Sequence, residues 1–148
     1  MVAYEEFQKK YELPSIVDLE NEFGIELKKK SVNEVIESII DVFSENAKLL
    51  ESLLFIDSGS SPSKLYEASM LRENEIDVFY IYKQLMAMFW QGKKSLFSVE
   101  NKQKAEFIKN SYKNWKELKN ELIKVFDLFE KEWPSVVFRQ SDQTIYHG

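Results

Sequence analysis

The chain has 148 residues, 44% of them hydrophobic, a formal net charge of −5, no cysteine and a single histidine, His147. This composition argues against a disordered chain and excludes disulfide frameworks, cysteine nucleophiles and thiolate zinc sites. It also excludes a di-metal site of the ferritin type, which needs two Glu-x-x-His motifs. The longest apolar stretch, Val78 to Trp90, falls short of the roughly 20 residues that span a bilayer. We therefore expect a cytoplasmic protein with no membrane segment.

Two short helices are predicted at the start of the chain. The first covers residues 3–12, where aromatic side chains recur at helical spacing. The second covers residues 16–23, because Ser15 offers an N-cap and Gly24 offers a stop.

The first long helix is predicted over residues 32–56. Ser31 and Glu34 have the spacing of a capping box, which marks its start. Its apolar positions form a stripe wide enough to contact two neighbouring elements: Ile36, Ile40, Phe43, Ala47, Leu50 and Leu54. The serine-rich stretch 57–63 predicts a loop, and a short helix is expected over residues 62–71.

The next helix is predicted over residues 75–91, with Asn74 as N-cap and Gly92 as the stop. Of the fifteen residues from Ile76 to Trp90, twelve are apolar or aromatic. Such a helix needs neighbours all round, so we place it at the centre of the bundle. Its aromatic residues would also suit the wall of a ligand pocket, an interpretation that we rank below simple core packing.

The last and longest helix is predicted over residues 99–133, with Ser98 as N-cap and Pro134 as the stop. Its apolar stripe alternates steps of three and four residues, which is typical of coiled-coil packing within the domain or against a partner. The stripe consists of Ala105, Ile108, Tyr112, Trp115, Lys119, Leu122, Phe126, Phe129 and Trp133. Trp115 is expected to be buried against residues 86–90 of the central helix. Trp133 is expected to be partly exposed, or covered by the tail or a second chain.

These elements predict an all-α fold. We expect an antiparallel helical bundle with three long helices and two or three short ones, formed by residues 1–134 as a single domain. Residues 135–148 are expected to form a C-terminal tail that is irregular or a small hairpin.

The predicted function is that of a non-enzymatic protein-interaction module: an adaptor, a small subunit or an inhibitor of a larger partner. The chain contains no P-loop, dinucleotide fingerprint or Ser-His-acid set, so we predict no catalytic residue, no metal and no cofactor. Aromatic residues near the C-terminus are the candidate interaction site, for a protein partner or a homodimer: Phe126, Phe129, Trp133, Phe138 and Tyr146.

The alternative is a nucleic-acid-associated accessory subunit. Six lysines of the last helix fall within about 80° of one another on a helical wheel and are candidates for binding a polyanion: Lys102, Lys109, Lys113, Lys116, Lys124 and Lys131. Seven acidic residues share this helix, however, so an ordinary solvated face is the interpretation that we rank first.

Four short segments carry a resemblance to known sequences. They are Leu13-Pro14-Ser15, Leu65-Tyr66-Glu67, Ala105-Glu106-Phe107-Ile108-Lys109 and Trp115-Lys116-Glu117. In this order they resemble small, uncharacterised, all-helical proteins of archaea, over residues 1–133. The resemblance implies a helical intracellular protein and brings no known activity with it.

Overall fold

The computed structural model describes residues 2–28 and 31–137, which form an all-α structure as predicted. Its helices are α1 (Tyr4–Tyr11), α2 (Ile16–Phe23), α3 (Val32–Leu54), α4 (Pro62–Glu73), α5 (Val78–Phe97) and α6 (Asn101–Glu132), followed by the 3-10 turn η1 (Trp133–Ser135). The described residues contain no β-strand, only an isolated bridge between Ala3 and Ser31. Most of the predicted tail lies outside them.

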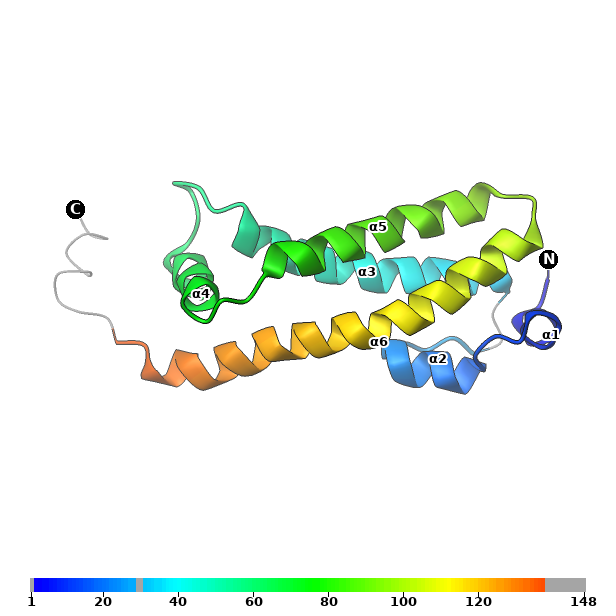
Figure 1. Cartoon of the computed structure of the whole chain (residues 1–148), viewed down its shortest axis with the longest axis horizontal. Helices are drawn as coiled ribbons and strands as arrows, with labels where there is room; N and C mark the ends of the chain where they lie inside the picture. Colours follow the sequence, from blue (N-terminus) through cyan, green and yellow to red (C-terminus); the bar gives the residue numbers. More distant parts are fainter. Residues whose placement is uncertain (1, 29–30, 138–148) are drawn as a thin grey trace.

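The three long helices form an antiparallel up-down-up arrangement. Figure 1 shows α3 and α5 side by side, with α6 crossing beneath them and running the length of the molecule. The short helices α1 and α2 cover one end, where the N-terminus lies. At the opposite end α4 lies across the bundle and contacts both α3 and α6.

Both ends of α2 and the starts of α3 and α4 lie where the sequence places them. Ser31 and Glu34 form the complete capping box at the start of α3. Ser15 caps α2, and Gly24 ends it with a φ of 67°, a left-handed conformation that glycine adopts without strain. Ser61 caps α4. In each case the signal depends only on residues within one helical turn, so tertiary packing does not override it.

The predicted starts of α5 and α6 were wrong. Asn74 does not cap α5; it ends α4, where its side-chain amide donates to the carbonyl of Met70 at 2.8 Å. The N-cap of α5 is Asp77, whose carboxylate accepts a backbone N–H of the first turn. Ser98 lies two residues before the N-cap position of α6, and its hydroxyl accepts the N–H of Glu100 at 3.1 Å.

Gly92 does not stop α5, contrary to the prediction. The helix continues through it because Gly92 is buried where α5 crosses its neighbours. A Cβ atom at this position would lie 2.5 Å from the side chain of Ile40 and 2.7 Å from that of Phe107. The glycine therefore permits close approach of α5 to α3 and α6, and long-range packing sets its role.

The expectation that α5 is surrounded at the centre of the bundle was also wrong. Trp90 is 62% exposed and Phe97 is 89% exposed, and Phe79 and Tyr80 are about half exposed. The helix with the most completely buried side chains is α3, among them Val35, Ile36, Ile39, Phe43 and Leu50. A count of apolar residues shows how hydrophobic a helix is but not how many neighbours will cover it.

α6 is one continuous helix of 32 residues. Four of the nine positions of its predicted stripe are buried, and at three others the buried residue is the preceding one. The buried seam consists of Ile108, Ser111, Trp115, Leu118, Leu122 and Val125. The larger side chains of Tyr112, Lys119 and Phe126 lie at its edge. Smaller residues at the seam allow the helices to approach, an effect that a hydrophobic pattern alone does not show.

Trp115 is buried, as predicted, but its aromatic neighbours are not those of α5. The indole is 5% exposed and stacks on Phe23 of α2 with 5.8 Å between ring centroids. Phe43 of α3 lies at 5.9 Å on another side. The indole N–H donates to the carbonyl of Glu22 at 2.8 Å, and the ammonium of Lys119 donates to the same carbonyl at 3.0 Å. The ring therefore joins α2 and α3 to α6.

Candidate functional site

The outward side of α5 carries an unusual group of exposed residues. We define the outer face of α5 by these residues: Phe79, Tyr80, Lys83, Trp90, Lys93, Lys94 and Phe97. Successive residues of a helix are about 100° apart, so Phe79, Trp90 and Phe97 lie within roughly 20° of one line. At about 1.5 Å per residue this line is roughly 27 Å long.

The charge of the outer face of α5 is positive throughout. Residues 78–97 include three lysines and no aspartate or glutamate. The ammonium of Lys83 lies 5.1 Å from the ring centroid of Phe79, and that of Lys93 lies 5.6 Å from the centroid of Phe89. Lysine and aromatic side chains are therefore in contact along the same helix, which gives a surface that is both cationic and apolar.

An apolar pocket of about 400 Å³ lies between α3, α4 and the start of α5. Its lining is aliphatic and aromatic, with Leu53, Ile56, Leu65 and Phe79 among its members. Its charged residues are Arg72 and Asp77, both exposed, so they lie where the pocket opens to solvent. Small-molecule sites usually have this character, with volumes of about 300–1,000 Å³ and few polar groups.

An aromatic cluster connects this pocket to the outer face of α5. Phe79 belongs to both, and its ring lies 6.5 Å from that of Tyr82. Phe55, at the end of α3, meets Tyr82 edge-on at 5.9 Å. The hydroxyl of Tyr82 donates to a carboxylate oxygen of Glu51 at 2.8 Å. This hydrogen bond raises the pKa of Tyr82, and it fixes the ring between α3 and α5.

Two of the predicted C-terminal interaction residues contribute to the surface and edge of α6. Phe126 is 42% exposed and lines an apolar depression of about 340 Å³ between α2, α3 and α6. Phe129 is partly buried against the core. Phe138 and Tyr146 lie outside the described residues.

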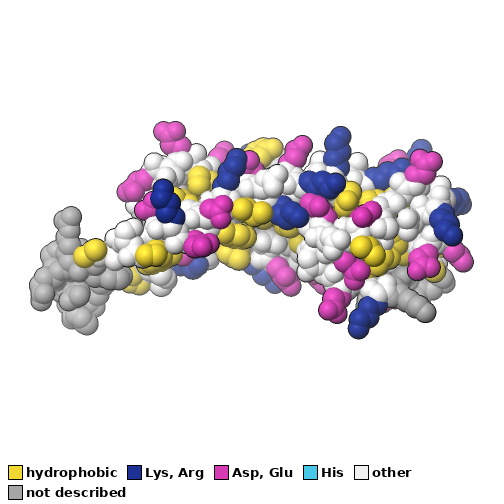
Figure 2. Space-filling view, turned by 90° about the horizontal axis from the view of Figure 1, so that it is seen from below, with side chains coloured by type: hydrophobic (Ala, Val, Ile, Leu, Met, Phe, Trp, Pro, Cys, Tyr) yellow, Lys and Arg dark blue, Asp and Glu magenta, His cyan; other side chains and the backbone are white. Residues whose placement is uncertain are grey.

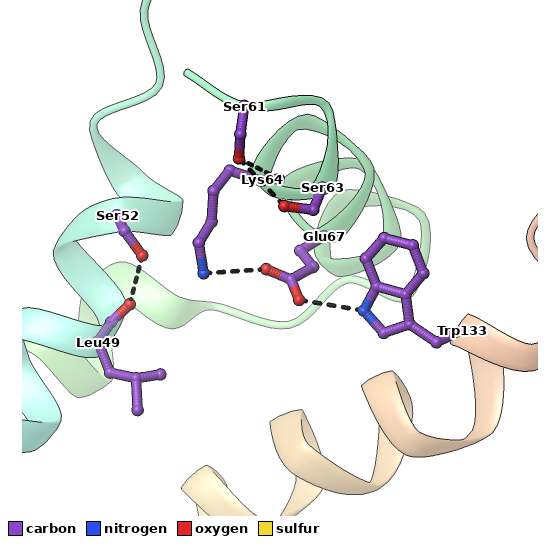
Figure 3. Close-up of polar contacts among 7 residues, drawn as sticks. All are labelled: Leu49, Ser52, Ser61, Ser63, Lys64, Glu67 and Trp133. Carbon is purple, nitrogen blue, oxygen red and sulfur yellow. Dashed lines mark hydrogen bonds and ion pairs between the residues drawn. The ribbon is translucent and has the colours of Figure 1, made fainter. Parts of the chain in front are cut away.

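Trp133, a third predicted interaction residue, is half-buried against α4. Its indole N–H donates to Glu67 at 3.1 Å, and its ring meets Tyr66 edge-on with 6.3 Å between centroids. Figure 3 shows that Glu67 lies between Trp133 and Lys64. The ammonium of Lys64 is 3.2 Å from a carboxylate oxygen of Glu67. Trp133 was predicted to be partly exposed, or covered by the tail or a second chain; it is partly exposed, and its contact is with α4.

All six candidate lysines of α6 are exposed. Acidic side chains lie among them: Glu121 forms an ion pair of 2.9 Å with Lys124, and Glu106, Glu117, Asp127 and Glu130 are exposed on the same helix. Figure 2, which views the molecule from the side where α6 lies, shows charges of both signs interspersed with hydrophobic patches. The lysines therefore do not form an uninterrupted cationic track.

The outer face of α5 was not predicted from the sequence. Its signal was present, because Lys83, Lys93 and Lys94 are the charged residues of an otherwise apolar helix. Charged residues mark the side of a helix that faces solvent. The aromatic residues within a turn of these lysines, such as Trp90, were therefore candidates for exposure.

Within residues 2–28 and 31–137, no group of three or more His, Cys, Asp or Glu side chains is placed to hold a metal ion. None of the helices in this part of the chain has the length and apolarity needed to cross a membrane. No known family model, curated protein or solved structure matches the chain.

Proposed function

We propose that this protein is a non-enzymatic interaction module in the cytoplasm, which binds a larger protein through the outer face of α5. One observation carries the proposal: four exposed aromatic side chains share a helix with three lysines and no acidic residue. The cysteine-free composition fits a reducing compartment.

Residue type supports protein binding at this face. Trp and Tyr are enriched among the residues that contribute most to binding energy, because they bury a large area and lose little conformational entropy. Trp90 and Tyr80 are both exposed here, with Phe79 and Phe97 beyond them on the same helix. Exposed apolar side chains bordered by polar ones often mark interaction sites.

Charge identifies the kind of partner. A two-fold antiparallel pairing of α5 with a second copy would place Lys83 opposite Lys93 and Lys94 of that copy, with no acidic residue of α5 to offset them. Like charges in close pairs are destabilising, so this homodimer is disfavoured. A partner with an apolar strip bordered by Asp and Glu complements both properties of the face. The module then acts as an adaptor, small subunit or inhibitor.

A nucleic-acid-associated role remains the alternative. Bases of single strands stack on exposed aromatic rings, and lysines contact the backbone phosphates. The exposure of all six α6 lysines favours it, whereas the acidic residues among them weaken it. The experiment below separates the two.

The test places a photo-crosslinking phenylalanine analogue at position 90 or 97 of the chain in an extract of the source organism. Position 17 on α2 is the matched control, since Val17 is 62% exposed, the same fraction as Trp90. We expect the same protein to be crosslinked from positions 90 and 97 and not from position 17. This crosslinked product should disappear when Lys83, Lys93 and Lys94 are replaced by Glu.

Two results would contradict the proposal. Identical crosslinked products from positions 90 and 17 would show that the face has no selectivity. Products that nuclease treatment removes would establish the nucleic-acid alternative instead. Because the lysines are exposed, their replacement should change the free energy of unfolding by no more than about 0.5 kcal/mol each, which circular dichroism during urea unfolding will verify.

A further inference from the structure

The apolar pocket between α3, α4 and α5 lies beside the outer face of α5 but differs from it in form. It is concave, with a volume of about 400 Å³, and aliphatic side chains such as Leu53, Leu65 and Ile76 dominate its lining. It exists because α4 lies across the end of the bundle and buries only Met70 and Leu71. Ala68, on the side of α4 that lines the pocket, is too small to fill it.

The two charged residues at the opening of the pocket have different surroundings. The carboxylate of Asp77 accepts the backbone N–H of Tyr80 at 3.0 Å, and it lies at the N-terminus of α5, where the helix dipole is positive. Its charge is therefore partly offset. Within the described chain, the guanidinium of Arg72 forms no salt bridge or hydrogen bond, so its charge has no such partner.

Two further acidic residues lie near Arg72 in the chain but outside the pocket lining. Glu73 accepts a hydrogen bond from the hydroxyl of Ser69 at 3.4 Å. Glu75 lies in the tight turn between α4 and α5, with a φ of 55°, and is exposed. Among the residues that line the pocket, Arg72 is the one cation and Asp77, whose carboxylate caps α5, is the one anion.

We propose that this pocket binds a medium-chain aliphatic anion, with the alkyl chain among the leucine and isoleucine side chains and the anionic head paired with Arg72. An unbranched chain fits an aliphatic lining that offers few hydrogen-bond partners. A guanidinium binds a carboxylate through two parallel hydrogen bonds, which fixes the head at the opening. This site adjoins the outer face of α5, with which it shares Phe79, but its ligand is distinct from the protein partner proposed for that face.

The test uses three ligands that share a ten-carbon chain and differ in the head: decanoate, decanol and decyltrimethylammonium. Isothermal titration calorimetry at neutral pH, below the micelle concentration, measures each dissociation constant for the full chain. We expect saturable binding of one molecule, with decanoate about three- to tenfold tighter than decanol and the cation weakest, as one exposed ion pair allows.

Three variants assign the site. Arg72→Gln should bring the affinity for decanoate down to that for decanol. Asp77→Asn keeps a good N-cap and should increase the affinity for decanoate by removing a negative charge. Ala68→Phe should abolish binding of all three ligands by filling the pocket. Trp90→Ser, on the outer face of α5 and away from the pocket lining, should leave all three affinities unchanged.

The proposal is overturned by any of three results. These are no saturable binding of decanoate, equal affinity for the three heads, or binding that survives in folded Ala68→Phe. Circular dichroism shows whether Ala68→Phe is folded. If it is not, the affinities of Arg72→Gln and Asp77→Asn for decanoate test the proposal, because both residues are exposed and their replacement does not disturb the core. Their predicted effects on decanoate are opposite in sign, and a matching shift for decanol, which carries no charge, would contradict the pairing of the head with Arg72.

Discussion

The two ends of the molecule differ, and two tryptophans illustrate the difference: Trp115 within α6, and Trp133 directly after it. Trp115 is buried among Phe23 and Phe43, and its N–H binds a backbone carbonyl. Trp133, the first residue of η1, is half-buried, and its N–H donates to the side chain of Glu67 on α4. The first lies in a core formed by three helices, whereas the second joins two helices near the molecular surface.

The difference follows from the helices that cover α6 at each end: α1 and α2 near the N-terminus, and α4 at the opposite end. Near the N-terminus, α1 and α2 contribute large buried side chains such as Tyr4, Leu19 and Phe23. At the other end α4 contributes only Met70 and Leu71 to the buried set, and an apolar pocket remains beside it. We conclude that the short helices at the α1–α2 end bury more large side chains than α4 does at the other end.

The largest effect is expected at Trp115, in the core of the end covered by α1 and α2, which we call the packed end. Trp115→Ala removes a large buried aromatic ring and leaves a cavity between α2, α3 and α6, so the free energy of unfolding should fall by about 3–5 kcal/mol. Urea unfolding followed by circular dichroism measures it. A loss below about 1 kcal/mol would contradict our view of this end.

A smaller effect is expected where α5 crosses its neighbours. Gly92→Ala gains helix propensity of up to about 1 kcal/mol, but its Cβ would lie 2.5 Å from the side chain of Ile40. Overpacking of this kind typically costs about 1–3 kcal/mol, so we expect net destabilisation in the same assay. Gln91→Ala is the matched control, because Gln91 is exposed and should tolerate the change. Stabilisation by Gly92→Ala would show that the crossing is loosely packed.

The packed end should also respond to alkaline pH through Tyr4. Burial, with Asp18 nearby, raises the pKa of Tyr4, whose hydroxyl donates to the carbonyl of Pro14 at 2.6 Å. Because the pKa of Tyr4 is higher in the folded than in the unfolded state, the protonated hydroxyl contributes fully to the free energy of unfolding below the unfolded-state pKa of about 10. This contribution is lost as the pH rises above that value. Tyr4→Phe should be about 1 kcal/mol less stable at pH 7 and should lose stability less steeply above pH 10. Parallel curves of urea midpoint against pH would contradict this.

The smallest effect is expected at the end where α4 lies across the bundle. Trp133→Phe keeps an aromatic ring and removes only the N–H that donates to Glu67. Because this contact is half-exposed, the free energy of unfolding should change by about 0.5 kcal/mol. The loss is measured by thermal or urea unfolding. A loss in the free energy of unfolding as large as that of Trp115→Ala would mean that both ends contribute equally to stability.

Features set by neighbouring residues were predictable from the sequence. The capping box of Ser31 and Glu34, and the caps at Ser15 and Ser61, placed three helix starts correctly. The all-α fold followed from the same local signals together with helical spacing. These interactions are formed within one turn, so the sequence contains all the information that they need.

Features that depend on packing were not predictable in this way. Gly92 resembles a helix stop, but Ile40 and Phe107 require it inside α5. Leu118 and Val125 fill the seam of α6 in place of bulkier neighbours, and the apolar α5 has one side left uncovered. Each outcome depends on which helix lies opposite, and a single sequence does not provide that information directly.

Native-state hydrogen exchange measures the contrast between the two ends most directly, because it reports local opening free energies along the chain. The account predicts that amides of α4 exchange through local opening at a free energy well below that of global unfolding. Amides of α3 and of the first half of α6 should exchange only through global unfolding. Equal protection of α4 and α3 would contradict the claim that α4 is less tightly packed than the long helices.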